Sequence, residues 1–91
     1  QNNALNIVQA NARDEDGFAL QLFPNPNQTG VVSLNAVFDQ IQISDTKGQV
    51  RLKAQQTDRL MLQDLDSGVY IVKAFLNGKS WVKRLIYQQN L

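Results

Sequence analysis

The sequence predicts an all-β domain, an immunoglobulin-like antiparallel β-sandwich of about seven short strands with Greek-key connections. Three observations lead to this fold class. Short runs alternate apolar and polar side chains, turn residues separate the runs at intervals of roughly eight to twelve positions, and no stretch shows the apolar period of a helix. With 91 residues, the chain has room for one modest hydrophobic core and therefore for a single domain.

The first two runs lead into a pair of prolines. Leu5–Ala12 is expected to form a leading strand within residues 1–17, which we interpret as a linker to an upstream part of a longer protein. Phe18–Phe23 is the second run, and it opens the domain proper, residues 18–91. We expect this strand to end at the Pro24–Pro26 segment, because proline has no N–H group to donate to a strand ladder.

The middle of the chain predicts a hairpin. Val31–Phe38 and Ile41–Ser44 each alternate apolar and polar side chains and are expected to be separate strands. Asp45–Gly48 is a turn sequence in which Gly48 can take the positive φ of a bulged hairpin loop. The chain then returns through Val50–Ala54.

The last third predicts a second hairpin. Gln55–Asp58 is interpreted as a polar connection, and Arg59–Leu65 as a strand that contributes leucines to the core. Val69–Leu76 is apolar at nearly every position, which is typical of a central strand covered on both faces. Asn77-Gly78 favours a type I′ turn, after which Lys79–Tyr87 pairs back along that strand.

Tyr70 follows the turn that contains Gly68. In Greek-key sandwiches, a tyrosine in this place can donate its hydroxyl to the upstream backbone and form a tyrosine corner, which fixes a crossover between two sheets. We therefore predict a structural role for Tyr70.

Composition excludes several functions. The chain has no cysteine and no histidine, which excludes disulfides, thiolate and imidazole catalysis, and the common zinc sites. A net charge of +1 does not indicate nucleic-acid binding, and no apolar run reaches the ~20 residues of a membrane span. From Val69 onward, however, the chain carries Lys73, Lys79, Lys83 and Arg84 and no acidic residue. The final hairpin is thus predicted to be basic.

Acidic residues provide weaker alternatives. Two short acidic stretches, Asp14-Glu15-Asp16 and Asp64-x-Asp66, lie in predicted loops. In other proteins, carboxylates from two loops bind a calcium ion or form the catalytic pair of a glycosidase. Neither stretch matches a known calcium-loop spacing, and a small sandwich has little room for a catalytic cleft. We interpret both as ordinary acidic turns and predict no catalytic residue, metal site or cofactor.

Three segments resemble a known family. Phe23–Pro26, Ile41–Val50 and Leu65–Ile86 together look like the C-terminal sorting domain, type A, of proteins exported by the type IX secretion system of Bacteroidetes. That family has a Pro-x-Pro segment, then an Asp-x-x-Gly hairpin turn, then a Leu-x-x-Gly-x-Tyr strand and a basic terminal hairpin. All of them occur here in that order.

The resemblance implies an address for export rather than an enzyme. An upstream passenger would cross the inner membrane with its own signal and pass through the periplasm. The outer-membrane translocon would then recognise the C-terminal domain, and the passenger would reach the cell surface or the medium. In many members a cysteine-type sortase removes the domain, and we expect any cleavage in or just before Gln1–Gly17. In others the domain is retained and docks to components of the same machinery.

The resemblance also assigns residues. The sorting motif comprises Pro24, Pro26, Asp45, Gly48, Leu65, Gly68, Tyr70, Asn77 and Gly78. For the recognition surface we predict Lys79, Trp81, Lys83, Arg84 and Leu85 in the last hairpin. An exposed hairpin edge can be read by strand addition aided by charge, and the same edge can pair two copies of the domain.

A module of another class is the runner-up. Immunoglobulin-like or fibronectin-like accessory domains bind carbohydrate or space the domains of secreted enzymes. Sugar binding needs exposed aromatic rings, and Trp81 and Tyr87 share a strand face that offers a small platform. The sequence does not decide whether Trp81 lies in the core, at its rim or at a partner.

Overall fold

The fold consists of strands alone. The computed structural model describes residues 18–89, so Leu5–Ala12 and the rest of the 1–17 linker lie outside the described residues. The strands, in chain order, are β2 (Leu22–Phe23), β3 (Val31–Ser44), β4 (Val50–Met61), β5 (Gly68–Leu76) and β6 (Lys79–Tyr87). All of them join in one antiparallel sheet. The predicted all-β class is confirmed, whereas a two-sheet sandwich of seven strands is not.

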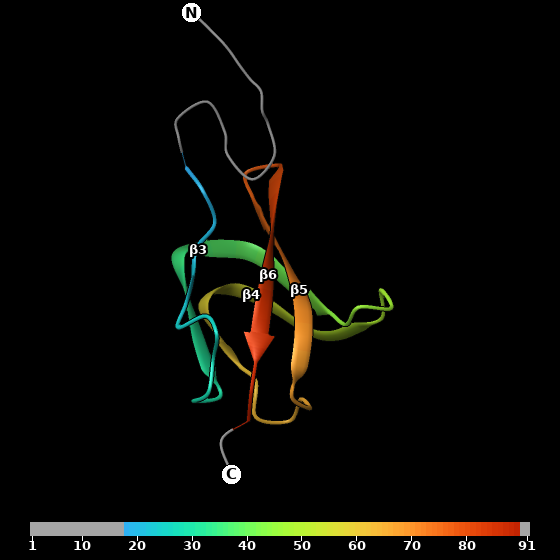
Figure 1. Cartoon of the computed structure of the whole chain (residues 1–91). Helices are drawn as coiled ribbons and strands as arrows, with labels where there is room; N and C mark the ends of the chain where they lie inside the picture. Colours follow the sequence, from blue (N-terminus) through green and yellow to red (C-terminus); the bar gives the residue numbers. More distant parts are fainter. Residues whose placement is uncertain (1–17, 90–91) are drawn as a thin grey trace, which may run out of the picture.

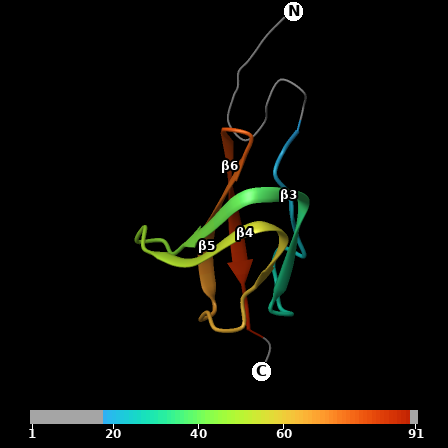
Figure 2. The same cartoon turned by 180° about the vertical axis from the view of Figure 1, so that it is seen from behind.

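The sheet is organised around β3. Strand β4 pairs with β3 along one edge, β2 and β5 share the opposite edge, and β6 continues outward from β5. Both β3 and β4 bend sharply, so the sheet curls around its own inner face (Figures 1 and 2). The curl brings β6 toward the segment that contains β2, and an isolated parallel bridge joins Asn27 to Tyr87.

The predicted break between Val31–Phe38 and Ile41–Ser44 is absent. Both runs belong to β3. Phe38 and Ile41 are both buried although they are an odd number of positions apart, so the alternation of buried and exposed side chains shifts by one residue between them. The β3–β4 register shifts just before this point, between Ser33 and Phe38. A change of phase looks like two strands in a sequence, but an irregularity within one bent strand produces it too.

The predicted polar connection Gln55–Asp58 is also wrong. These residues lie within β4, and Gln55 and Thr57 pair with β3. Gln56 has a φ of 52°, in the left-handed region, which allows the strand to bend without leaving the sheet. Their polarity reflects exposure to solvent, since β4 is an edge strand with only one neighbour.

Strand β5 is covered on one face only. Tyr70, Val72 and Ala74 are buried, while Val69 and Lys73 are exposed. The prediction of two covered faces is therefore wrong, because a single curled sheet buries its inner face and leaves the outer face to solvent or to partners.

Both predicted turns are confirmed. Gly48 has a φ of 86° and donates its N–H to the Asp45 carbonyl at 3.0 Å. The Asp45 carboxylate accepts the N–H groups of Lys47 and Gln49, each at 3.0 Å, and so closes the turn from inside. At the tip of the last hairpin, Asn77-Gly78 has φ values of 54° and 79°, as a type I′ turn requires.

The inner face of the curl is the hydrophobic core. Three rings from distant segments meet in it: the centroid of Trp81 lies 5.1 Å from that of Phe18 and 6.0 Å from that of Phe38. Such edge-on contacts add to the burial energy of the rings. The buried hydrophobic residues are Leu20, Leu22, Val32, Leu34, Phe38, Ile41, Ile43, Leu60, Leu62, Tyr70, Val72, Ala74, Trp81, Leu85 and Tyr87.

Candidate functional site

The β5–β6 hairpin is the candidate functional site. Its register is unbroken from Gly68↔Tyr87 to Leu76↔Lys79. At the tip, the Asn77 N–H donates to the Asp39 carboxylate of β3 at 3.1 Å, which ties the turn to the body of the sheet. The hairpin is therefore a rigid element held at its tip as well as along β5.

The inner face of β6 belongs to the core. Trp81 is 5% exposed and Leu85 is 0% exposed, so both predicted recognition residues support the hairpin from inside and offer no surface to a partner of the folded domain. Tyr87 is 3% exposed, and the aromatic platform that sugar binding needs is consequently buried. The structure thus places Trp81 in the core.

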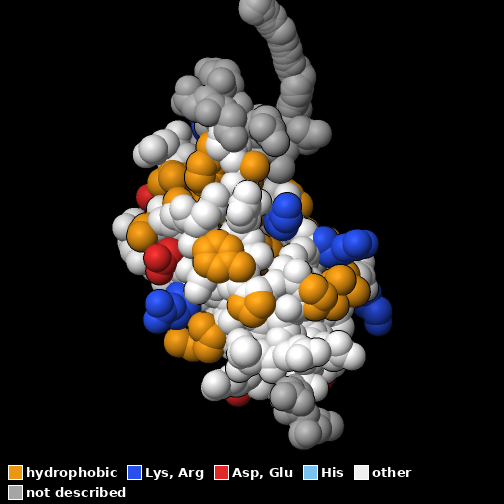
Figure 3. Space-filling model, turned by 60° about the vertical axis from the view of Figure 1, so that its left-hand side comes forward, with side chains coloured by type: hydrophobic (Ala, Val, Ile, Leu, Met, Phe, Trp, Pro, Cys, Tyr) orange, Lys and Arg blue, Asp and Glu red, His pale blue; other side chains and the backbone are white. Residues whose placement is uncertain are grey.

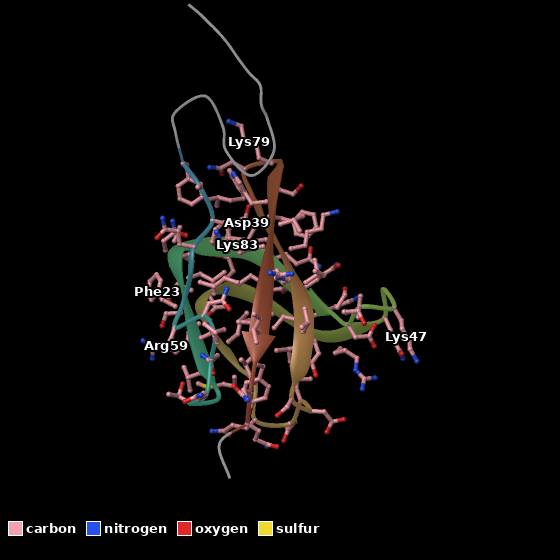
Figure 4. All side chains as sticks on the ribbon, viewed as in Figure 1. Phe23, Asp39, Lys47, Arg59, Lys79 and Lys83 are labelled. Carbon is pink, nitrogen blue, oxygen red and sulfur yellow. The ribbon has the colours of Figure 1, made fainter. Side chains whose placement is uncertain are left out.

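The basic side chains of the hairpin are exposed. Figure 4 shows Lys79 near the tip and Lys83 further along β6, and Arg84 is exposed as well. The Lys73 ammonium lies 5.3 Å from the Phe75 ring centroid. Within residues 18–89 the one ion pair joins Arg51 to Asp45, so neither Lys83 nor Arg84 has a carboxylate partner there.

The domain also has a mixed surface. Figure 3 shows a face on which exposed hydrophobic side chains are interspersed with lysine or arginine side chains and a few acidic ones. Large exposed hydrophobic residues include Phe23, Met61 and, on β6 itself, Val82, which is 49% exposed. An apolar surface with positive charge suits a partner with apolar groups and carboxylates.

The loop that contains Pro24 and Pro26, which we call the proline loop, binds the hairpin. Strand β2 ends at Phe23, as predicted, but it comprises only Leu22–Phe23 and not the predicted Phe18–Phe23. The peptide bonds before Pro24 and Pro26 are both cis. Between the prolines, the Asn25 side chain donates to the Arg84 carbonyl at 2.8 Å and accepts the Ile86 N–H at 3.0 Å. The Asn25 amide therefore occupies the position of a paired residue at the outer edge of β6.

Asn27 completes this clamp from a fully buried position. Its backbone N–H donates to the Ile86 carbonyl at 2.7 Å, and its carbonyl accepts the Gln88 N–H at 2.8 Å. Its side chain holds the loop itself: the amide donates to the carbonyls of Val31 and Pro24, and its oxygen accepts the Gly30 N–H at 2.9 Å. All of its polar groups are satisfied inside the protein.

Sequence reasoning missed these asparagines. Asn25 and Asn27 alternate with the prolines, and asparagine in such a loop commonly bonds the nearby backbone, which was the available signal. The partners of the Asn25 side chain, Arg84 and Ile86, are 59 and 61 residues away along the chain, and no local pattern indicates them. Asn35 has a similar role on β3, where its side chain bonds the backbone of Ala19 and Gln21.

The predicted hydrogen bond of Tyr70 is present. Its hydroxyl donates to the Asp66 carbonyl, four residues upstream. Burial raises the pKa of the Tyr70 hydroxyl, with the Asp66 charge as a further cause. Because β4 and β5 belong to one sheet, this bond fixes the turn before the hairpin rather than a crossover between two sheets. Leu65, in the same turn, packs against the core.

The motif glycines differ in what the fold needs from them. Gly48 and Gly78 have positive φ, which disfavours any other residue. Gly68 has no such φ, and a Cβ atom there would meet nothing within 4 Å. The fold of the described residues therefore accepts a larger residue at position 68.

Among the described residues, neither a cluster of metal-ligating side chains nor a membrane-spanning helix is found. Residues 18–89 contain no group of three or more aspartate, glutamate, histidine or cysteine side chains arranged to hold a metal. Asp14-Glu15-Asp16, half of the calcium alternative, lies outside the described residues. In the same part of the chain, no helix is long and apolar enough to cross a membrane.

A sequence model of the secretion system C-terminal sorting domain matches residues 21–88. The chain belongs to this family. The match runs from the β2 segment to the end of β6, so the sorting domain includes the proline loop, both turns and the clamped hairpin. No curated protein matches the sequence. Family membership makes this a C-terminal sorting signal of type IX secretion, which directs export to the cell surface or the medium.

Proposed function

We propose that this sorting domain is the export address of an upstream passenger and that the outer-membrane translocon reads it after the passenger has reached the periplasm. The domain catalyses nothing and supplies a recognition surface. The family match over residues 21–88 is the observation that carries this proposal. Within the domain, the exposed part of β6 around Lys83 and Arg84 is the part that the translocon contacts.

The geometry supports a rigid recognition element. The hairpin is fixed at its tip by Asp39 and at its other end by Asn25 and Asn27. Preorganisation lowers the entropy cost of binding, because little of the surface has to be ordered when the partner arrives. Exposed Lys83 and Arg84 add charge to that surface.

The fate of the domain after export has two versions. In the first, a sortase removes it by cleavage in or just before residues 1–17 and attaches the passenger to the cell surface. In the second, the domain is retained and docks to the export and attachment machinery. Mass spectrometry of the exported passenger distinguishes the two, because only cleavage creates a new C-terminus.

A fusion experiment tests the address. The 91-residue chain is placed after a fluorescent protein that has an N-terminal export signal, and the fusion is expressed in a Bacteroidetes host with and without a functional type IX translocon. We expect fluorescence outside the outer membrane only when both the domain and the translocon are present. A folded fusion that stays in the periplasm of the intact host contradicts the proposal.

Locating the recognition surface needs variants that keep the core. Deleting Lys83–Leu91 would also remove Leu85 and Tyr87, so a loss of export after deletion reports on folding as well. The better variant is Lys83→Glu with Arg84→Glu, and the matched control is Lys53→Glu with Arg59→Glu on the exposed side of β4. We expect the first pair to abolish export and the second to leave it intact.

A glycan array tests the carbohydrate-binding alternative. With Trp81 and Tyr87 buried, we expect no glycan to bind the folded domain. Binding that survives in the intact chain would favour the accessory-module function.

A further inference from the structure

The outer edge of β6 is open over only part of its length. In an antiparallel hairpin with a two-residue turn, alternate residues direct their N–H and C=O groups away from the partner strand. The Arg84 carbonyl and both backbone groups of Ile86 point outward in this way, since they bond Asn25 and Asn27. By the same alternation, the backbone groups of Ser80 and Val82 point outward too.

The open part has defined ends. Below it, Asn25 and Asn27 occupy the edge at Arg84 and Ile86. Above it, the Phe18 ring contacts Trp81 on the inner face, near the tip of the hairpin. Between these ends, the N–H and C=O groups of Ser80 and Val82 and the N–H of Arg84 accept or donate no hydrogen bond within residues 18–89. We call this stretch, Ser80–Arg84, the open edge.

Unpaired backbone groups on an exposed strand are a template for another strand. The side chains beside the open edge indicate which kinds of residue the added strand has. Val82 is 49% exposed on the outer face, next to Arg84, while Lys83 lies on the opposite face of the strand and is exposed as well. An added strand therefore meets a positive charge on both of its faces and one apolar side chain at its centre.

We infer that the open edge binds an extended, acidic peptide segment of a partner protein by strand addition, with carboxylates placed beside Lys83 and Arg84. This deepens the proposed function, on which it rests, by naming the backbone groups and the partner chemistry of the recognition step. Because Asn25 limits the edge, the added strand is short, and its affinity depends on both hydrogen bonds and charge.

A proline at position 82 tests the hydrogen bonds. The Val82 N–H points outward, so Val82→Pro removes a donor of the open edge without removing a bond to β5, and proline is tolerated on such an edge. Val82→Thr is the matched control, because it loses the same apolar contact but keeps the N–H. The probe is a capped hexapeptide in which glutamate alternates with valine. The control peptide has lysine in place of each glutamate.

Binding to the full 91-residue chain is measured by titration, with amide NMR shifts to locate the site. We expect the glutamate peptide to bind wild type, to shift the Ser80, Val82 and Arg84 amides most, and to bind Val82→Pro at least tenfold more weakly than Val82→Thr. Lys83→Gln with Arg84→Gln should weaken it at least fivefold. Equal binding of the lysine peptide, or shifts confined to other strands, overturns the inference.

Export separates this inference from the proposed function. The fluorescent fusion carrying Val82→Pro should stay in the periplasm, while that carrying Val82→Thr should be exported. If both are exported and wild type needs the translocon, the sorting function stands and the open-edge inference fails. If wild type is exported without the translocon, the proposed function itself fails. Circular dichroism confirms that each variant folds, and the Lys83→Gln with Arg84→Gln variant tests the same edge if Val82→Pro does not fold.

Discussion

At the scale of single residues, asparagine side chains hold the loop that precedes β3 and join it to β6. Asn27 is the fully buried polar residue of the core region, with three hydrogen bonds from its side chain. Two of the partners are carbonyls and one is an N–H group, and an apolar replacement removes all three bonds, although the Val31 carbonyl keeps the Thr29 hydroxyl as a donor. Unsatisfied buried groups are costly, and the site is therefore sensitive to changes that keep its volume.

Asn27→Ala should lower the free energy of unfolding by about 2–4 kcal/mol, because it removes these three hydrogen bonds and opens a small cavity. Urea denaturation followed by tryptophan fluorescence measures the loss, since Trp81 is buried in the same core. Gln28→Ala, at the exposed neighbour, is the control and should change stability by less than about 0.5 kcal/mol. A similar loss in both variants would contradict the role given to Asn27.

Tyr70 should make stability depend on alkaline pH. Its folded-state pKa is raised by burial above the unfolded value of about 10, so the folded protein holds this proton more tightly. The resulting stabilisation is complete below pH 10 and is lost as the pH rises through the folded pKa. Tyr70→Phe removes this contribution, so wild type should lose more stability than the variant between pH 9 and 11, as urea denaturation at each pH measures. Parallel pH profiles would contradict it.

The role of a residue could be predicted from the sequence where its hydrogen-bond partners are close to it along the chain. Tyr70 bonds a carbonyl four residues away, and Asp45 bonds the amides of its own turn, so a short motif contains all the information. Asn25 bonds a strand 59 residues away, and Trp81 is buried because segments from elsewhere cover it. Those roles depend on the curl of the sheet, which no short motif indicates.

At the scale of elements, the turns set the register of the strands. Asn77-Gly78 places Lys79 opposite Leu76, and every later pair of the hairpin follows from that choice. The sequence predicted both turns because positive φ requires particular residues. It divided β3 and β4 wrongly because bent strands with register shifts interrupt the alternation on which strand prediction depends.

Two glycines of the hairpin test whether the turn requires a residue that accepts positive φ. Gly78→Ala should destabilise the domain by about 1–2 kcal/mol, because alanine disfavours a φ of 79°. Gly68→Ala should be neutral within about 0.5 kcal/mol, since position 68 has neither a positive φ nor a neighbour in the way. Thermal unfolding of the two variants measures the difference, and a larger effect at position 68 would contradict it.

At the scale of the whole molecule, the curl of the sheet is closed at one end only. At one end of β6, backbone bonds join Asn27 to Ile86 and Gln88, and two residues earlier in the loop the contact is made through the Asn25 side chain. Toward the tip of the hairpin, side chains meet across the gap, as in the ring contact of Phe18 and Trp81. The closure thus leaves a short stretch of the β6 edge exposed beside positive charge, while β4 remains a separate edge strand of the sheet.

Amide hydrogen exchange should record this partial closure along a single strand. The N–H groups of Trp81 and Lys83 point toward β5, and that of Ile86 is bonded to Asn25, so all three should exchange slowly. Ser80 and Val82 point outward into the open edge and should exchange at least about tenfold faster. In Asn25→Ala, exchange at Ile86 should approach that of Val82, while Trp81 stays protected by β5. Uniform protection along β6 in the wild type would mean that another segment already pairs with the open edge, and the acidic strand of a partner would then have to displace it.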